Sequence, residues 1–347
     1  MFRLTIVLFA TSLFAGSLFS TPSTGDDQQE TQQQQRARIP GWNEKKIENY
    51  LGHDSCRKCH KLQVEKLETT AHFTSFERTH RLPKAKAYCQ QLGIRSIKRD
   101  QRCVRCHYTP EESRRGVVAQ SGVSCESCHG PAKHWAKVHN DYGGLLTTKA
   151  REKPAHRVAR ISESIKKGMR HPSNLYLLAK SCYECHLVDD AQLVNVTDHP
   201  PVTAEFNMVS WSQGSMRHNF LRTDNKSNGV SSPARLRVMF VADLLAKLEA
   251  CMQALARSER GSEHFNAMTL QYVSASKQID AISSAIDNTY VNEASRLLQA
   301  VQPVAEPKIL RAAADGMGKI GFEFGKHEKS HQLEAIQSML PDPSQYR

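Results

Sequence analysis

The pattern Cys-x-x-Cys-His occurs four times in this chain of 347 residues. Each copy places two thiols within one helical turn and an imidazole directly after them, so that one short stretch offers two covalent attachment points and one metal ligand. Eight of the ten cysteines fall in this pattern. The copies are Cys56, Cys59 and His60; Cys103, Cys106 and His107; Cys125, Cys128 and His129; and Cys182, Cys185 and His186.

This spacing is typical of haem attachment, in which the thiols bond to the two vinyl groups of one porphyrin and the histidine ligates its iron. Zinc would need four ligands per site, and a histidine directly after the second cysteine points poorly into the same tetrahedron. Thioredoxin-type disulfide chemistry explains one Cys-x-x-Cys pair, but not four copies that are each followed by histidine. The sequence therefore predicts four covalently bound haems c, with the motif histidines as proximal iron ligands.

The composition agrees with a core that is filled in part by cofactors. Hydrophobic residues make up 39% of the chain, which is little for a protein of this length. Four large apolar macrocycles would be buried where side chains otherwise lie. We expect a mainly α fold, with sparse regular structure around the four haems and a helical bundle after them.

Composition and periodicity divide the chain into four parts. The first part is apolar with one cation at Arg3, as in a secretory signal, and a retained membrane anchor is the alternative. The second part is polar and rich in glutamine, as in a disordered tether. The expected parts are a signal peptide (1–20), a tether (21–41), a tetrahaem domain (42–228) and a helical bundle (229–347).

Apolar stripes at helical spacing predict the bundle. Ser232 followed by Pro233 is a typical helix start. We interpret the stripes as core rather than as a cofactor site, and a docking or dimerisation module is the other interpretation of this region. The first two stripes are Leu236, Phe240, Leu244, Leu248 and Leu255, then Phe265, Met268, Tyr272, Ile279, Ile282 and Ile286.

The formal net charge of +12 needs a partner other than nucleic acid, because an exported chain meets no genome and the sequence contains no recognisable nucleic-acid module. Four haems would bring eight propionates and leave a mildly basic particle. Such a surface attracts an acidic redox protein, and we expect that class of partner. We expect no membrane span in the mature chain unless the signal is retained as an anchor, and a periplasmic or otherwise exported location.

The sixth ligand of each iron decides between an electron carrier and a site that binds small molecules. His72 and His80 lie on one helix face at i and i+8, about 12 Å apart along the axis, so that they could serve two irons but not the same one. No catalytic side chain is identifiable from the sequence.

The four stretches "CRKCHKLQVEKLETTAH", "RCVRCHYT", "GVSCESCHGPAKHWAKVH" and "SCYECHL", over residues 56 to 187, resemble the tetrahaem cytochrome c-554 family. The type member of that family carries electrons from hydroxylamine oxidoreductase in ammonia-oxidising bacteria. The resemblance implies a mainly helical fold with closely stacked haem pairs. It covers neither the first 41 residues nor the region after about residue 225.

The resemblance also implies distal ligands from other parts of the chain. His139 is similar to the distal ligand of the first haem, opposite His60, and His72 to that of the third, opposite His129. His218 is similar to the distal ligand of the fourth haem, with His199 as a rival. In that family the second haem has no protein ligand on its distal side, which implies an open iron beside His107.

Five histidines have no counterpart in the family pattern, and any of them could close the second site. His171 and His199 are the favoured candidates because they flank the fourth motif and have proline neighbours. Cys89 and Cys251 fall outside the motifs, with a buried thiol expected for Cys251 and a disulfide between the two as the alternative. The five histidines are His80, His134, His156, His171 and His199.

Two functions follow from these alternatives. With every iron closed, the chain is an exported cytochrome that relays electrons between redox partners. With one iron open, it is an enzyme acting on a small nitrogen compound such as nitric oxide, nitrite or hydroxylamine. The carrier is the favoured interpretation, because it needs no further catalytic group.

Overall fold

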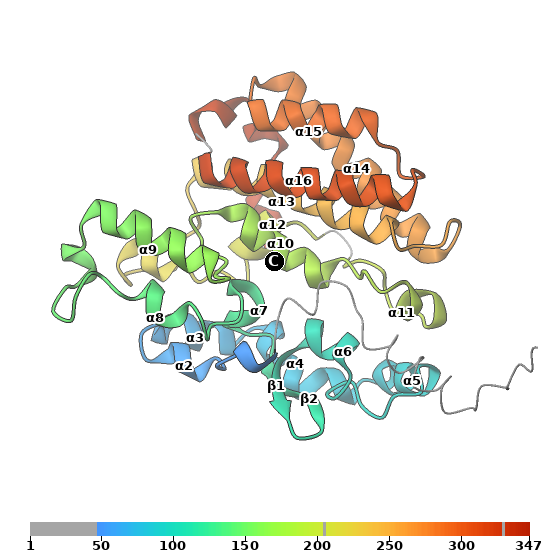
Figure 1. Cartoon of the computed structure of the whole chain (residues 1–347), viewed down its shortest axis with the longest axis horizontal. Coiled ribbons are helices and arrows are strands. Elements are labelled where there is room, and N and C mark those ends of the chain that lie inside the picture. Colours follow the sequence, from blue (N-terminus) through green and yellow to red (C-terminus); the bar gives the residue numbers. More distant parts are fainter. Residues whose placement is uncertain (1–46, 204–205, 328–329) are drawn as a thin grey trace, which may run out of the picture. The chain divides into compact units, whose positions relative to one another are not determined.

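The computed structural model describes residues 47–203, 206–327 and 330–347. Helices dominate this part of the chain, with one β-hairpin among them (Figure 1). The mainly α fold expected from the sequence is therefore confirmed. The expected signal peptide (1–20) and tether (21–41) lie outside the described residues. The expected boundary between residues 228 and 229 stays a prediction.

Short helices carry the four motifs and connect them. The hairpin pairs antiparallel, from Tyr108 opposite Gly122 to Ser113 opposite Gly116. The elements of this half are α2 (Asp54–Arg57), α3 (Lys61–Glu68), α4 (Ala71–Arg78), α5 (Pro83–Gln91), α6 (Gln101–His107), β1 (Tyr108–Ser113), β2 (Gly116–Gly122), α7 (Cys125–His129), α8 (Ala136–His139), α9 (Pro154–Lys166), α10 (Leu175–His186), α11 (Ala191–Val196) and α12 (Met208–Gln213).

The hairpin fixes α4 against the second and third motifs. Val123, just after β2, donates its backbone N–H to the carbonyl of His72 over 3.0 Å. A Cβ at Gly122 would lie only 1.8 Å from the carbonyl oxygen of Phe73, so this close approach requires glycine. The sequence analysis did not identify this hairpin, which brings the helix that carries His72 close to two motifs.

Local capping determines where the motif helices begin. The Asp100 side chain accepts a hydrogen bond from the Arg102 N–H at the start of α6. Ser124 and Ser127 form a reciprocal capping box at the start of α7. Such caps satisfy N–H groups that a helix leaves without partners, and each contributes about 1 kcal/mol.

Four long helices form the expected bundle after residue 229. The Ser232 side chain caps α13 as the sequence predicts, and α13 is buried on nearly all sides rather than along one stripe. None of the described helices combines the length and hydropathy that a bilayer span requires. The bundle consists of α13 (Pro233–Leu255), α14 (Glu263–Ala285), α15 (Thr289–Ala300) and α16 (Pro307–His327), followed by a 3₁₀ helix (Ser330–Met339).

The helix of the fourth motif, α10, belongs to the core of the bundle. Its buried residues, which include Tyr176 and Ala179, pack with those of α13 and α16 in one continuous apolar cluster. A Cβ at Gly321 of α16 would lie 2.3 Å from the Tyr176 ring, so glycine permits this contact. Tyr176 also donates its hydroxyl hydrogen bond to the buried Glu249 carboxylate on α13. The fourth motif and the bundle therefore share one core.

Candidate haem sites

Each motif lies on or beside a helix that fixes the positions of its thiols. The helices α6, α7 and α10 end at the motif histidines His107, His129 and His186. In the first motif α2 ends at Arg57, and His60 is instead the residue that precedes α3. Because the thiols of each motif are separated by two residues, this local structure holds them within one turn.

Each motif histidine faces one further histidine ring. His60 and His139 have ring centroids 6.2 Å apart and nearly parallel planes at 23°. The other three pairs are closer to perpendicular. They are His107 with His199 at 6.2 Å and 66°, His129 with His218 at 6.2 Å and 89°, and His186 with His72 at 5.9 Å and 73°.

The four separations fit a metal between the rings. A first-row transition metal binds an imidazole nitrogen at about 2.0 Å, and the ring centre lies about 1.1 Å beyond that nitrogen. Two axial imidazoles on one iron therefore have centroids about 6.2 Å apart. Within the described residues, no group of three or more His, Cys, Asp or Glu side chains is arranged as a site for a bare metal ion. Two histidines per site match the iron ligands of a haem c, and the two thiols match its covalent attachment points.

Hydrogen bonds at Nδ1 leave Nε2 free for the iron in these pairs. A carbonyl oxygen cannot donate, so each Nδ1 that lies against one carries the proton, and Nε2 keeps its lone pair. Metal-binding histidines almost always have such a partner on the other ring nitrogen. The carbonyl partners are Arg170 for His129 (3.2 Å), Ala136 for His139 (2.5 Å), Pro200 for His199 (3.0 Å) and Met216 for His218 (2.7 Å).

Two further rings have side-chain partners at Nδ1. His186 lies 2.9 Å from the Thr203 hydroxyl, and His72 lies 2.9 Å from the Met216 sulfur. Burial also lowers the pKa of His107, His129 and His186 to about 4 each. These imidazoles are therefore neutral at pH 7, which is the form that binds a metal.

The structure brings His139 to His60 as the sequence analysis expected, but it exchanges two other partners. His72 lies beside His186 rather than His129, and His218 lies beside His129 rather than His186. The segment after the fourth motif explains the exchange. Phe206 stacks flat on the His186 ring, with the ring centroids 4.0 Å apart. The chain then continues through α12, and His218 lies beyond this helix, next to His129.

His199 lies beside His107. The second site therefore has a second imidazole, where the family pattern implies an open iron. The Tyr88 ring contacts His199 at 5.6 Å, and the Tyr88 hydroxyl donates to the neighbouring Asp198 carbonyl over 3.1 Å. His171, the other favoured candidate, instead hydrogen-bonds through Nδ1 to the Ser173 hydroxyl.

His134, His156 and the leftover cysteines have ordinary structural surroundings, whereas the buried Nδ1 of His80 has no hydrogen-bond partner among the described residues. His134 contacts the Asn49 side chain, and His156 contacts the Glu152 carboxylate. Cys251 is buried in the bundle core as expected, whereas Cys89 packs with a separate cluster around Val104. The alternative of a disulfide between them is wrong, because both are free thiols.

The motifs adjoin one another in the order first, third, fourth and second. Cys56 of the first motif and Cys125 of the third share a hydrogen bond. Helix α7 of the third motif contacts α10 of the fourth, and α10 contacts α6 of the second. Across this last contact, the Cys106 and Cys185 thiols donate to the carbonyls of Glu184 (3.6 Å) and Arg105 (3.7 Å).

Part-buried charges hold neighbouring motifs together. The Arg170 guanidinium pairs with Glu184 of the fourth motif, while the Arg170 carbonyl lies against His129 of the third. Arg105 of the second motif pairs with Asp189, just beyond the fourth, and the Glu184 and Asp189 carboxylates favour the charged form of these two arginines. Each guanidinium is paired with a carboxylate of opposite charge, which compensates its positive charge.

Residues 55–130, which contain the first three motifs, match the family described as cytochrome c554 and c-prime. Over 148 residues the chain is 27% identical to cytochrome c-554 of Nitrosomonas europaea. It resembles this family of c-type cytochromes. The match covers 40% of this chain and 57% of the relative, so it leaves much of both proteins unaligned. No solved structure matches the chain.

The sequence analysis missed several residues that organise the sites of this cytochrome-like chain. Glu126, within the third motif, is fully buried and accepts backbone hydrogen bonds from Leu51, Gly52 and Ala132. It thereby ties the third motif to the segment before the first. Arg170 and Met216 were missed as well, because their roles depend on contacts far along the chain that no local spacing indicates.

Proposed function

We propose that this protein is an exported tetrahaem c-type cytochrome that relays single electrons between redox partners. The observation that carries the proposal is the second imidazole, which lies about 6 Å from every motif histidine. When bound, each haem supplies an iron that gains and loses one electron. The thiols would attach the four groups, and the paired histidines would hold their irons and exclude solvent ligands.

The adjacency of the motifs supports a relay. In the proposed order, electrons enter or leave at the first and second sites and cross the third and fourth between them. The ion pairs of Arg105 with Asp189 and of Arg170 with Glu184 lie along this path and join neighbouring motifs. A relay of this kind needs no group that makes or breaks bonds.

The charge distribution supports an acidic redox protein as the partner. Residues 131–170 contain ten lysines and arginines against three acidic residues, a formal +7 of the chain's +12. We call this segment the basic segment. It contains His139 of the first site, and the fully exposed Leu145 and Leu146 lie within it. Transient redox interfaces are small, with an apolar centre and charges that steer the partner.

The alternative enzyme, acting on nitric oxide, nitrite or hydroxylamine, requires one open iron. We prefer the carrier because His199 lies where it would close the second site, the one for which the family pattern implies an open position. Export is part of the proposal and is supported by the signal-like sequence of residues 1–20.

Carbon monoxide tests the proposal, because it binds only a ferrous haem with a vacant or weakly held position. A pyridine haemochrome assay first establishes how many haems the purified chain holds, and we expect four. We then expect the Soret band of the dithionite-reduced protein to be unchanged by carbon monoxide. A shift by the share of one haem in four would favour the enzyme, and the absence of c-type bands would overturn both functions.

A further inference from the structure

One loop serves the distal histidines of two sites. This loop, Gly214–His218, follows α12. The Met216 carbonyl accepts a hydrogen bond from Nδ1 of His218 over 2.7 Å, and the Met216 sulfur lies 2.9 Å from Nδ1 of His72. His218 faces His129 of the third site and His72 faces His186 of the fourth. The position of Met216 therefore orients two distal imidazoles together.

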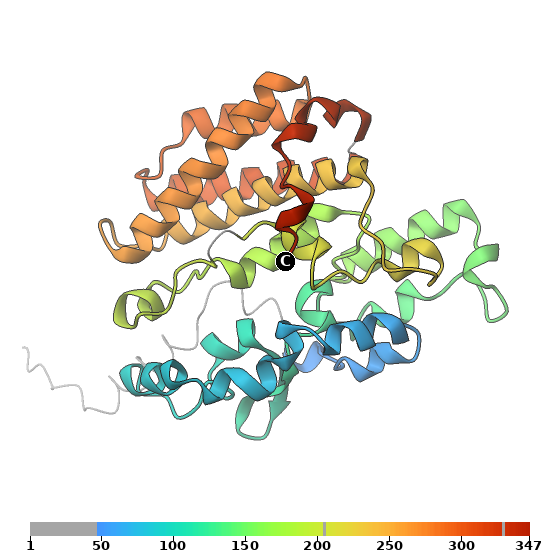
Figure 2. The same cartoon turned by 180° about the vertical axis from the view of Figure 1, so that it is seen from behind.

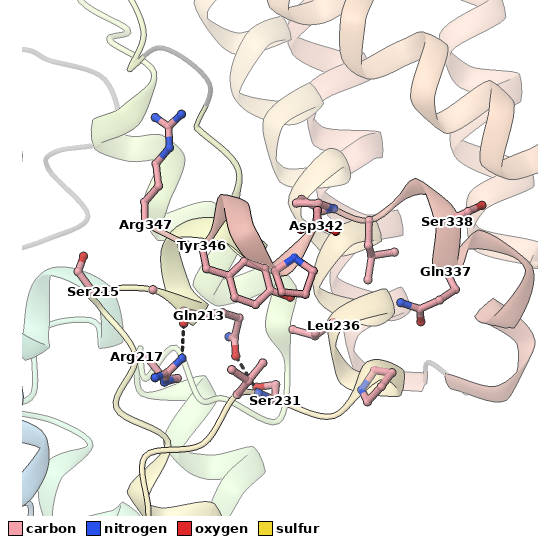
Figure 3. A pocket seen from close by; sticks show the side chains of 16 residues that line it. Gln213, Ser215, Arg217, Ser231, Leu236, Gln337, Ser338, Asp342, Tyr346 and Arg347 are labelled. Carbon is pink, nitrogen blue, oxygen red and sulfur yellow. Dashed lines mark hydrogen bonds between the residues drawn. The ribbon is translucent and has the colours of Figure 1, made fainter.

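The last described segment, Pro341–Arg347, holds this loop in place. The Arg347 carbonyl accepts a hydrogen bond from the Ser215 N–H over 2.6 Å, and the Arg347 N–H donates to the Ser210 carbonyl over 3.1 Å. A Cβ at Gly214 would lie 1.8 Å from the Arg347 carbonyl oxygen. Figure 3 shows Arg347 and Tyr346 close to Gln213 and Ser215. The segment and the loop thus meet backbone to backbone.

The segment is itself anchored in the bundle. The preceding 3₁₀ helix buries Leu333 and Ile336 completely in the bundle core, and Leu340 and Tyr346 pack against the same core. In Figure 2 the red end of the chain runs from the bundle across α13 toward α12. A pocket of about 1060 Å³ lies beside the contact, lined by residues of both the segment and the loop. The pocket borders the backbone contact between the segment and the loop.

We propose that Pro341–Arg347 is a positioning segment for the distal ligands His218 and His72. The inference rests on the proposed function, because it takes both histidines as iron ligands. It gives the bundle a part in the haem sites: the bundle sets the coordination of the third and fourth irons through a loop that contacts both ligands, without supplying a ligand of its own.

Gly214→Ala in the full haem-loaded chain is the direct test. The added methyl group cannot occupy the space of the Arg347 carbonyl, so the segment must move away from the loop. We expect carbon monoxide to shift one to two quarters of the Soret intensity, and the high-spin fraction of the oxidised protein to rise by the same share. Gly229→Ala is the matched control, because the nearest atom to its Cβ is 3.9 Å away, and it should bind no carbon monoxide.

Met216→Leu tests the effect of the loop on His72 separately from its effect on His218. It keeps the backbone carbonyl that orients His218 but removes the sulfur beside His72, so the change should be confined to one quarter of the intensity, at the fourth site. A chain that ends at Leu340 removes the segment without adding a clash. It provides the same readout if Gly214→Ala does not fold.

The outcomes separate this inference from the proposed function. Carbon monoxide binding to the unaltered protein would contradict the closed coordination on which the proposed function depends. If the unaltered protein binds none, and neither Gly214→Ala nor the shortened chain changes the spin state, the positioning role is wrong while the carrier function stands.

Discussion

The proposed closure of the second site depends on His199. Its ring lies 6.2 Å from His107, and its Nδ1 is bonded to the Pro200 carbonyl, which leaves Nε2 toward the site. We expect His199→Ala to open one iron in four, so that carbon monoxide shifts about one quarter of the Soret intensity of the reduced protein.

His171→Ala is the matched control for His199→Ala. His171 was the other candidate from the sequence, and its Nδ1 contacts Ser173. The control should bind no carbon monoxide. If His171→Ala opens an iron and His199→Ala does not, the assignment of the second distal ligand must be reversed.

Asp243 links stability to pH. Its carboxylate is almost completely buried on α13 and accepts the Tyr183 hydroxyl hydrogen bond over 2.7 Å. Burial raises its pKa from 3.8 to about 6, so the folded state favours the protonated acid. The stability that this preference contributes is complete below about pH 4 and is lost as the pH rises through about 6, a change of about 3 kcal/mol.

Asp243→Asn should remove this dependence, since asparagine is uncharged and still accepts the Tyr183 hydrogen bond. Urea unfolding of the haem-loaded protein between pH 4 and 7 would measure it, with the variant showing the flatter profile and the higher stability at pH 7. Equal slopes for the two proteins would show that Asp243 is not the titrating group.

The contact between α10 and α16 couples the fourth motif to the bundle. At Gly321 an added methyl group would meet the Tyr176 ring at 2.3 Å, and that ring is fixed by its hydrogen bond to Glu249. We expect Gly321→Ala to lower the free energy of unfolding by about 1–3 kcal/mol, the usual cost of overpacking a core. Thermal or urea unfolding of the haem-loaded chain measures this change.

Gly316→Ala, on the same helix, is the control for Gly321→Ala. Its Cβ would meet only the flexible end of Leu297, at 3.0 Å. Alanine favours a helix over glycine by about 1 kcal/mol, so the control should be neutral or stabilising. If both variants behave alike, α10 is less firmly packed on the bundle than the structure indicates.

The local sequence predicted the helices well, but it did not predict the contacts between them. The motif helices and the start of α13 follow from residues within one or two turns, such as the Ser232 cap. The pairing of His72 with His186 joins residues more than one hundred positions apart, and the contacts around it involve a hairpin and the loop Gly214–His218. Motif spacing contains no information about such packing. In the structure His139 lies beside His60, as the resemblance implies, whereas His72 lies beside His186 and His218 beside His129.

The distribution of charge over the whole molecule predicts where a redox partner docks. The basic segment, residues 131–170, holds more than half of the formal net charge in about a ninth of the chain, and the carbonyl of its last residue, Arg170, lies against His129 of the third motif. Opposite charges attract over about 8 Å at physiological ionic strength and over shorter distances in more salt. Reduction by an acidic donor protein should therefore slow as salt is added.

Charge reversal within the basic segment tests this location. Lys149 and Arg151 are exposed, and Lys149→Glu with Arg151→Glu should slow reduction by an acidic flavodoxin at low salt about tenfold or more, with little effect at high salt. Lys308→Glu with Lys319→Glu on α16 makes the same change in net charge elsewhere. Equal slowing by both pairs would mean that only the total charge matters. If only Lys149→Glu with Arg151→Glu slows reduction, electrons enter at the first site, because His139 lies within the segment whose charge was reversed.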